Sequence, residues 1–252
     1  MSLLSVVGLR KSFGGVAAVA DVGFSLEAGE ILALIGPNGA GKSTCFNLLN
    51  GQIRPDSGRV VLDGRDITGL APRRIARLGV GRTFQITATF ASMTVRENVQ
   101  LALLARHRQV WRFVRAAAGH FIAEAEALLE RVGMGAQAER AAGVLAYGDL
   151  KRLEIAIALA GMPRLLLMDE PAAGMARDER VALMRLCRTL ARQEGLAILF
   201  TEHDMEAVFG TADRILVLNR GALIAAGPPA AIRADAQVRE IYLGAEMPVE
   251  DC

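Results

Sequence analysis

The stretch Gly36-Pro37-Asn38-Gly39-Ala40-Gly41-Lys42-Ser43-Thr44 decides the fold of this chain. It fills every fixed position of the phosphate-binding pattern G-x-x-x-x-G-K-[ST]. The apolar run Ile31 to Ile35 comes directly before it and predicts a buried strand. Glycines in such a loop allow successive backbone N–H groups to converge on an anion. The stretch therefore predicts a strand, a phosphate-binding loop and a helix that starts near Gly41.

Two side chains of this loop point to a nucleotide bound with magnesium. Lys42 adds a full positive charge, and the helix that follows directs the positive end of its dipole at the same phosphates. Ser43 is expected to place its hydroxyl on the Mg²⁺ ion that bridges the β- and γ-phosphates. The loop is thus predicted to bind a nucleoside triphosphate.

An acidic pair follows a second buried strand, which the run Leu165 to Met168 predicts. Because Mg²⁺ prefers hard oxygen ligands, Asp169 is expected in the coordination sphere of the metal. Glu170 is placed to polarise an attacking water, the general-base role that a hydrolase needs. Alone, the pair is also compatible with an ordinary exit from a strand into a loop. Together with the phosphate loop, it predicts a hydrolytic site.

The order of apolar runs and turns predicts an α/β fold. Helical spacing over 94–132 separates a strand-rich start from a region in which strands and helices alternate. Such alternation implies a parallel sheet covered on both faces. Strands are predicted over 5–9, 22–26, 31–35, 59–62, 165–168, 196–200, 214–218 and 223–225. Helices are predicted over 153–160 and 181–192, and a short helical tail after Pro228.

With these motifs and several further ones, the chain resembles the nucleotide-binding subunit of an ABC transporter over essentially its whole length. Gln85 resembles the Q-loop glutamine, and the segment Leu145-Ala146-Tyr147-Gly148-Asp149 lies where the signature motif does. His203 resembles the switch histidine that contacts the γ-phosphate. Phe13 resembles the A-loop aromatic that stacks on adenine, although a lone Phe in such a segment often packs inward.

The resemblance implies a P-loop NTPase of the ABC cassette type. Its α/β fold would have a mainly parallel central sheet, an N-terminal antiparallel β subdomain and a helical subdomain. The ATP-binding core with the β subdomain is expected over residues 1–91 and 149–227. The helical signature subdomain is expected over 92–148, and a short helical tail over 228–252.

The resemblance also assigns roles to individual residues, with ATP and Mg²⁺ as cofactors. The expected catalytic residues are Glu170, His203 and Gln85. The expected Mg²⁺ ligands are Ser43, Gln85 and Asp169. The expected ATP-binding residues are Phe13, Gly36, Pro37, Asn38, Gly39, Ala40, Gly41, Lys42, Ser43 and Thr44. The signature, expected to act on ATP bound to a partner subunit, is Leu145, Ala146, Tyr147, Gly148 and Asp149.

Several segments together resemble one branch of the family, the branched-chain amino acid uptake ATPase with a long helical insertion. Related importers carry amides, urea or aromatic acids and have similar ATPases, so the transported solute stays open. The segments are Gly81 to Gln85, Met93 to Val99, Leu145 to Gly148, Glu170 to Gly174, Glu202 to Met205 and Tyr242 to Gly244.

Two segments depart from the family pattern. The signature usually reads Leu-Ser-Gly-Gly-Gln, and its hydroxyl is lost because Ala146 replaces the serine. Asp149 puts a negative charge near phosphates, or else acts as a cap at the helix start. In the D-loop, Ala176 stands where a polar Asp or Asn is expected. Both departures bear on communication between two ATP sites.

The resemblance implies a head-to-tail dimer with a second ABC ATPase, either another copy or a paralogue. Lys42, Ser43 and Asp169 of one subunit would face the signature at Gly148 of the other. Membrane permease subunits would be direct partners, and a solute-binding protein an indirect one. The main hypothesis is an ATP-hydrolysing importer subunit at the cytoplasmic face of the membrane. The alternative is a cassette that binds ATP but leaves most turnover to a paralogous partner.

Composition is consistent with these hypotheses and excludes others. The 252 residues are 52% hydrophobic with a net charge of +2, and the mean hydropathy is +0.30. The longest uncharged stretch, Thr83 to Val95, is shorter than the roughly 20 apolar residues of a membrane span. The balanced charge argues against nucleic-acid binding. The cysteines lack a C-x-x-C pair, as in reduced cytosolic proteins. A cluster of basic residues is interpreted as the solvent-exposed face of a short helix: Arg73, Arg74, Arg77 and Arg82.

Three other P-loop proteins are less compatible with the motifs. A DNA-repair or chromosome ATPase would need a long coiled-coil insertion between the two phosphate-site motifs. A translation factor would carry two copies of the motifs, and a small GTPase would carry an Asn/Thr-Lys-x-Asp motif.

Overall fold

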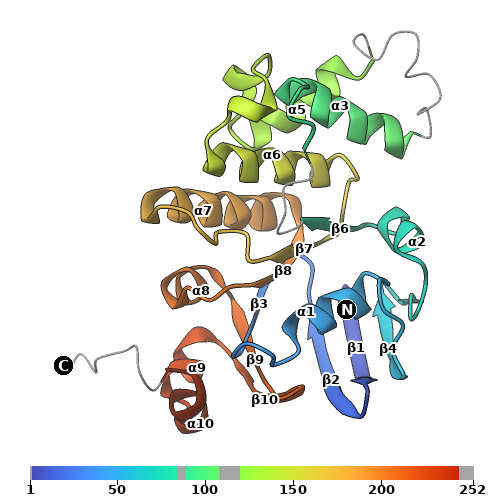
Figure 1. Ribbon diagram of the computed structural model, residues 1–252, viewed down its shortest axis with the longest axis vertical. Helices are drawn as coiled ribbons and strands as arrows, with labels where there is room; N and C mark the ends of the chain where they lie inside the picture. The colour runs from blue at the N-terminus through green and yellow to red at the C-terminus, as the bar shows by residue number, and fades with distance from the viewer. Residues whose placement is uncertain (1, 84–88, 108–119, 244–252) are drawn as a thin grey trace.

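The computed structural model describes residues 2–83, 89–107 and 120–243. Its framework is two β-sheets, of which the larger has the strand order β10-β9-β3-β8-β7-β6 and the smaller the order β2-β1-β4-β5 (Figure 1). The central strands are β3 (Ile31–Ile35), β6 (Val80–Thr83), β7 (Leu165–Asp169), β8 (Ala197–Thr201), β9 (Arg214–Asn219) and β10 (Ala222–Gly227). The smaller sheet contains β1 (Leu4–Phe13), β2 (Val16–Leu26), β4 (Ser57–Leu62) and β5 (Arg65–Asp66).

The strand pairings agree with the predicted fold class. β6, β7, β8, β3 and β9 are parallel, and β10 runs antiparallel to β9. The smaller N-terminal sheet is antiparallel throughout its described pairs. The mainly parallel central sheet and the N-terminal antiparallel sheet are therefore confirmed.

Helices lie on both faces of the central sheet. The helices are α1 (Lys42–Leu49), α2 (Pro72–Arg77), α3 (Val95–Arg106), α5 (Ile122–Arg131), α6 (Tyr147–Leu159), α7 (Arg177–Glu194), α8 (Met205–Thr211), α9 (Pro229–Ala234) and α10 (Ala236–Val238). In Figure 1, α3 and α5 lie beyond α6, which in turn lies beside α7, and α1 lies near the smaller sheet. No described helix is long and apolar enough to cross a bilayer.

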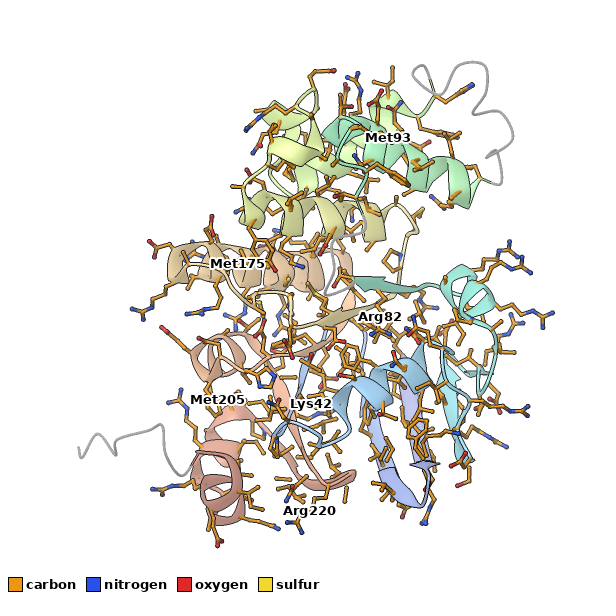
Figure 2. The ribbon with its side chains drawn as sticks, in the orientation of Figure 1. Lys42, Arg82, Met93, Met175, Met205 and Arg220 are labelled. Atoms are coloured by element: carbon orange, nitrogen blue, oxygen red, sulfur yellow. The ribbon has the colours of Figure 1, made fainter. Side chains whose placement is uncertain are left out.

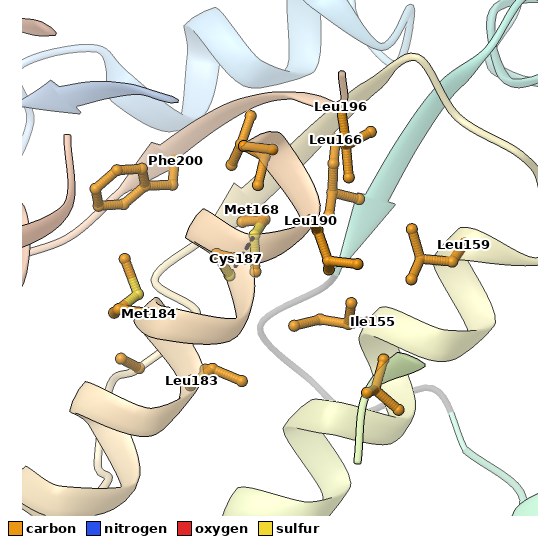
Figure 3. Close-up of a cluster of buried hydrophobic side chains, with 14 of the residues drawn as sticks. Ile155, Leu159, Leu166, Met168, Leu183, Met184, Cys187, Leu190, Leu196 and Phe200 are labelled. Atoms are coloured by element: carbon orange, nitrogen blue, oxygen red, sulfur yellow. Dashed lines mark hydrogen bonds between the residues drawn. The ribbon is translucent and has the colours of Figure 1, made fainter. Parts of the chain in front are cut away.

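The central strands are apolar throughout because both of their faces are buried. On β7, Leu166 and Met168 belong to a core formed with α6 and α7, whereas Leu165 and Leu167 belong to a core formed with α1 and the smaller sheet. β3 and β8 divide their side chains between the same two cores. Figure 3 shows side chains of α6 and α7 converging on those of β7 and β8. Only the strand ends are therefore free to carry polar groups.

Some predicted element bounds were wrong. The sequence pattern missed β6, whose four residues include Gly81 and Arg82; pairing with Leu165 to Met168 of β7 holds it in the sheet. α6 begins at Tyr147, earlier than the predicted 153, and so crosses the expected domain boundary between residues 148 and 149. The division into domains stays a prediction.

The interpretation of the basic cluster was also partly wrong. Arg73, Arg74 and Arg77 lie on the short helix α2 as expected. Arg82 does not belong to this helix, because it lies on β6 with its side chain only 12% exposed and pairs with Asp169. The sheet register, which a sequence cluster does not reveal, places it there.

The core between α7 and the sheet can be tested on one helix. Leu190 is buried against β7 and β8, so Leu190→Ala is expected to lower the free energy of unfolding by about 2–5 kcal/mol through lost burial and a cavity. The exposed Val181, on the same helix, provides the control. Val181→Ala is expected to change it by less than about 0.5 kcal/mol. Urea unfolding of both variants measures the difference, and equal losses would contradict this packing.

Candidate functional site

The phosphate loop joins β3 to α1 through two glycines that no other residue can replace without displacing backbone. A Cβ on Gly36 would lie 2.1 Å from the carbonyl oxygen of Leu218, and one on Gly41 would lie 2.2 Å from that of Ala18. Both glycines also have positive φ, of 150° and 105°. The loop is thus packed closely against β9 and β2, as a preformed anion cradle requires.

Lys42 is the first residue of α1, with its side chain inside the curve of the loop. Its Nζ donates hydrogen bonds to the carbonyl oxygens of Gly36, at 2.6 Å, and Pro37, at 3.2 Å. Burial lowers the pKa of Lys42, and the negative charges of Glu170 and Asp169 oppose that shift. Asn38, Gly39 and Ser43 are exposed around it. Figure 2 shows Lys42 in the middle of the molecule at the start of α1.

The carboxylates predicted for metal and water lie at the end of β7, where β8 holds both in place. The buried Thr201 donates its hydroxyl to Oδ1 of Asp169 at 2.8 Å. The backbone N–H of Glu170 is directed at the carbonyl oxygen and the Oγ1 of the same threonine, each at 3.1 Å. Glu170 has a φ of 49°, which is rare and strained for a residue with a side chain. Thr201 is thus a supporting residue to which the sequence analysis gave no role.

The structure brings the predicted His203 to the predicted Glu170. Nε2 of His203 lies 2.9 Å from Oε1 of Glu170. Asp204 fixes the chain immediately after the histidine, because it accepts a hydrogen bond from the N–H of Ala207 as the N-cap of α8 and pairs with Arg180 on α7 at 2.9 Å. The histidine and the glutamate can therefore act on one small molecule that lies next to both.

Glu202 is a second residue that sequence reasoning missed. Its side chain is buried, and it accepts hydrogen bonds from the N–H groups of Ala172, at 2.7 Å, and His203, at 3.2 Å. Burial raises the pKa of Glu202, and the two hydrogen bonds oppose that rise. The carboxylate thereby ties the segment after Glu170 to the segment that carries His203. An acidic residue between a buried strand and a histidine was the available signal.

Arg82 is the third residue that sequence reasoning missed. Its NH2 group lies 3.3 Å from Oδ2 of Asp169, and its NH1 group donates to Oδ1 of Asn47 on α1 at 2.7 Å. Burial lowers the pKa of Arg82, and Asp169 opposes that shift. Figure 2 shows Arg82 on β6. No local sequence signal marked this ion pair, because it depends on the pairing of β6 with β7.

Other predicted residues lie apart from this cluster. Phe13 is 48% exposed at the end of β1, with Nζ of Lys11 5.5 Å from its ring centre, so it does not pack inward. Its contact with adenine stays a prediction. Gln85 lies outside the described residues. The signature begins α6, which packs on the face of the central sheet opposite α1. Within one chain, the central sheet therefore lies between the signature and the phosphate loop.

The two departures from the family pattern have local structural consequences. Ala146 is the N-cap of α6, so Asp149 is not the cap; its Oδ2 accepts a hydrogen bond from Nε2 of Gln137 at 3.0 Å. Ala176 is the N-cap of α7 and lacks an oxygen with which to cap it. Tyr147 is partly exposed at the start of the signature helix. These positions remain candidates for contact with a partner subunit.

A groove of about 760 Å³ lies away from the phosphate loop. It is bounded by α2, β6, α3 and α6, and Arg73, Arg82, Arg106 and Ile157 are among its lining residues. No cluster of three or more His, Cys, Asp or Glu side chains able to hold a metal occurs among the described residues. A metal at the phosphate site would thus depend on few protein ligands, together with phosphate and water, as Mg²⁺ commonly does.

Comparisons with known proteins agree with the motifs. The family model "ABC transporter" matches residues 19–173, and the model "Branched-chain amino acid ATP-binding cassette transporter" matches residues 222–247. The chain is 43% identical to the high-affinity branched-chain amino acid transport ATP-binding protein LivG of Escherichia coli, covering 96% of this chain and 98% of that one. It is 42% identical to BraF of Pseudomonas aeruginosa, with the same coverage.

Solved structures agree as well. The ADP conformation of MJ1267, an ATP-binding cassette of an ABC transporter, matches with a TM-score of 0.87 and 30% identity, covering 97% of this chain and 99% of that one. The family resemblance and the fold class drawn from the sequence are confirmed.

The buried Glu202 leads to an expected pH dependence. Because its pKa is raised in the folded state, its contribution to stability is full below the unfolded value near 4.5 and is lost as pH rises through the folded pKa. The free energy of unfolding of the wild type, minus that of Glu202→Gln, is therefore expected to fall with rising pH and then level off. Urea unfolding at a series of pH values measures this difference.

Glu206 provides the matched control with the opposite sign. Its pKa is lowered, chiefly by the side-chain hydrogen bond from Arg177, so the stability it contributes is lost as pH falls. The free energy of unfolding of the wild type, minus that of Glu206→Gln, is expected to become smaller as pH falls. A flat or rising difference for Glu202→Gln would contradict the assignment.

Proposed function

The chain belongs to the ABC transporter family of ATPases, and from that membership we propose that it is the ATP-hydrolysing subunit of an importer for branched-chain amino acids or a related small solute. Its similarity to LivG and BraF, whose names refer to branched-chain amino acid transport, supports the choice of branch. The match of residues 222–247 to a model of the same branch supports it further. The helical insertion is the part of the chain that is expected to transmit closure of the ATPase to the permease.

One observation carries the proposed chemistry: Glu170 and His203 are in contact beside the phosphate loop residue Lys42. Nε2 of the histidine and Oε1 of the glutamate are 2.9 Å apart, and the charge of Glu170 acts on Lys42. Lys42 and the N-terminus of α1 would hold the β- and γ-phosphates of ATP. Glu170 would accept a proton from the attacking water, and His203 would orient the γ-phosphate.

The residues present fit Mg²⁺. Ser43 and Asp169 would supply a hydroxyl and a carboxylate, the hard oxygen donors that this ion prefers, and phosphates and water would provide the other ligands. When bound, Mg²⁺ neutralises charge that develops on the phosphates. The hydrogen bond from Thr201 leaves Asp169 oriented at the edge of the sheet. Gln85, the third predicted ligand, lies outside the described residues.

The proposed assembly is a head-to-tail dimer of ATPases bound to permease subunits at the cytoplasmic face of the membrane. The position of the signature on the face of the sheet opposite α1 supports this dimer, since only a partner chain could present a signature to the phosphate loop. The groove between α2 and α6 is the surface proposed for the permease. A solute-binding protein would deliver the solute on the far side of the membrane.

A cassette that binds ATP but hydrolyses it weakly is the alternative. The absence of a capping side chain at Ala176 and the carboxylate of Asp149 near the start of α6 favour it. Both residues lie where a partner subunit would be contacted, whereas Glu170 and His203 favour a hydrolytic site. The second experiment below separates the two hypotheses.

Replacement of Lys42, the positive charge of the phosphate loop, tests the ATP site. Lys42→Ala is expected to weaken ATP binding roughly 100-fold, or about 2.7 kcal/mol, because the phosphates lose a charge-assisted donor. Isothermal titration of the purified chain with ATP measures this change, and circular dichroism verifies the fold. The surface variant Arg164→Ala is the control, because this arginine forms an ion pair with Asp63 in which both side chains are exposed. Tight ATP binding by folded Lys42→Ala would refute the site.

Replacement of the proposed base tests hydrolysis. Glu170→Gln keeps the size of the side chain but removes its basicity, so turnover is expected to fall about 100- to 10,000-fold while ATP still binds. The substitution is made separately in each cassette of the assembled transporter, and ATPase activity and transport are both measured. Unchanged transport after replacement in this chain alone would support the weakly hydrolysing alternative.

A further inference from the structure

The carboxylate proposed as a metal ligand already has a cationic partner, to which the proposed chemistry gives no role. NH2 of Arg82 lies 3.3 Å from Oδ2 of Asp169, and the two side chains are only 12% and 15% exposed. Oδ1 of Asp169 accepts the hydrogen bond from Thr201. Each oxygen of the carboxylate thus has a protein partner. Because the pair is largely shielded from water, its attraction is much stronger than that of a surface pair.

Arg82 is held from the side of the phosphate loop as well. NH1 donates to Oδ1 of Asn47 on α1 at 2.7 Å and lies 3.3 Å from Oε1 of Gln52. The guanidinium carbon lies 6.0 Å from the ring centre of Phe46, also on α1. The planar guanidinium carries NH1 and NH2 at a fixed spacing, so it can bond two separate partners in a geometry that the single ammonium of a lysine does not reproduce. Arg82 therefore connects the helix of the phosphate loop to the end of β7.

We propose that Arg82 is a positioning residue that pairs with Asp169 and competes with Mg²⁺ for this carboxylate when the metal binds with the nucleotide. The inference rests on the proposed function, since Asp169 matters to a metal only in an ATP site. A bound Mg²⁺ and the guanidinium would repel each other when both lie close to one largely buried carboxylate. Arg82 therefore competes with the metal for the carboxylate.

This competition has two physical consequences. Without the metal, Arg82 offsets part of the negative charge of Asp169, which also acts on Lys42, and loss of the arginine would make this largely buried charge more costly to the fold. When Mg²⁺ binds, the bond between Arg82 and Asp169 is lost, and this loss makes the free energy of Mg²⁺ binding less favourable. Magnesium affinity is thus set by a balance between Arg82 and Mg²⁺, and not by the oxygen ligands alone.

The experiment compares nucleotide affinity with and without the metal. Full-length wild type and Arg82→Gln are titrated with trinitrophenyl-ATP, once in excess Mg²⁺ and once in EDTA. The affinity ratio is the affinity in Mg²⁺ divided by the affinity in EDTA. In Arg82→Gln this ratio is expected to be about tenfold higher than in the wild type, equivalent to about 1.4 kcal/mol. In a second measurement, electron paramagnetic resonance of Mn²⁺ in the presence of ADP is expected to detect tighter metal binding by the variant.

Arg164→Gln is the matched control, because it removes an arginine from an exposed ion pair with Asp63. Its affinity ratio is expected to equal that of the wild type. A merely structural role for Arg82 would weaken binding equally in both conditions and leave the ratio unchanged. An unchanged or lower ratio in folded Arg82→Gln therefore overturns the proposal.

A second variant keeps the test decisive if Arg82→Gln does not fold. Arg82→Lys retains a charge but replaces the two separate donor groups NH1 and NH2 with one ammonium, which is expected to hold Asp169 less well, so its ratio is expected to rise at least about twofold. A ratio equal to that of the wild type would then overturn the proposal. Failure of the proposed function gives a different result, since the wild type itself would bind no ATP or bind it without any effect of Mg²⁺.

Discussion

The pairing of β7 with β8 is the constraint on which the site depends. The two parallel strands place Asp169 opposite Thr201, and the hydroxyl and carbonyl of that threonine then fix Asp169 and the backbone of Glu170. Both strands are buried on both faces, so polar chemistry is confined to their carboxyl ends, where ligands of open α/β sheets bind. His203 and Glu202 follow β8 at this same edge. A single strand register therefore positions the proposed base, metal ligand and histidine together.

Much of this arrangement could be predicted from the sequence because its signals are local. The phosphate loop, the acidic pair and the buried strands Ile31 to Ile35 and Leu165 to Met168 are each contained in a short stretch with a distinctive pattern. The strand β6 could not be predicted, since its support comes from β7, far along the chain. The pairing of Arg82 with Asp169 follows from that register and is equally invisible to a local pattern. Glu202 belongs to a segment that resembles the family branch and Thr201 directly precedes it, but their hydrogen bonds depend on the adjacent strand end.

The two faces of the central sheet carry two separate hydrophobic cores. α1 and the smaller sheet lie on one face, whereas α6 and α7 lie on the other (Figure 1). Arg82 and Asp169 lie at the edge between them and connect α1 to β7. The departures at Ala146, Asp149 and Ala176 lie at the starts of α6 and α7.

The positive φ of Glu170 has a consequence for the history of such a chain. A backbone conformation that suits glycine or asparagine better than glutamate costs stability at this one position. Random substitutions that relieve the strain would make the chain more robust and remove its proposed base in the same step. Selection for stability alone would thus favour loss of the proposed base. The stability of this chain and its proposed chemistry therefore make opposite demands on one backbone angle.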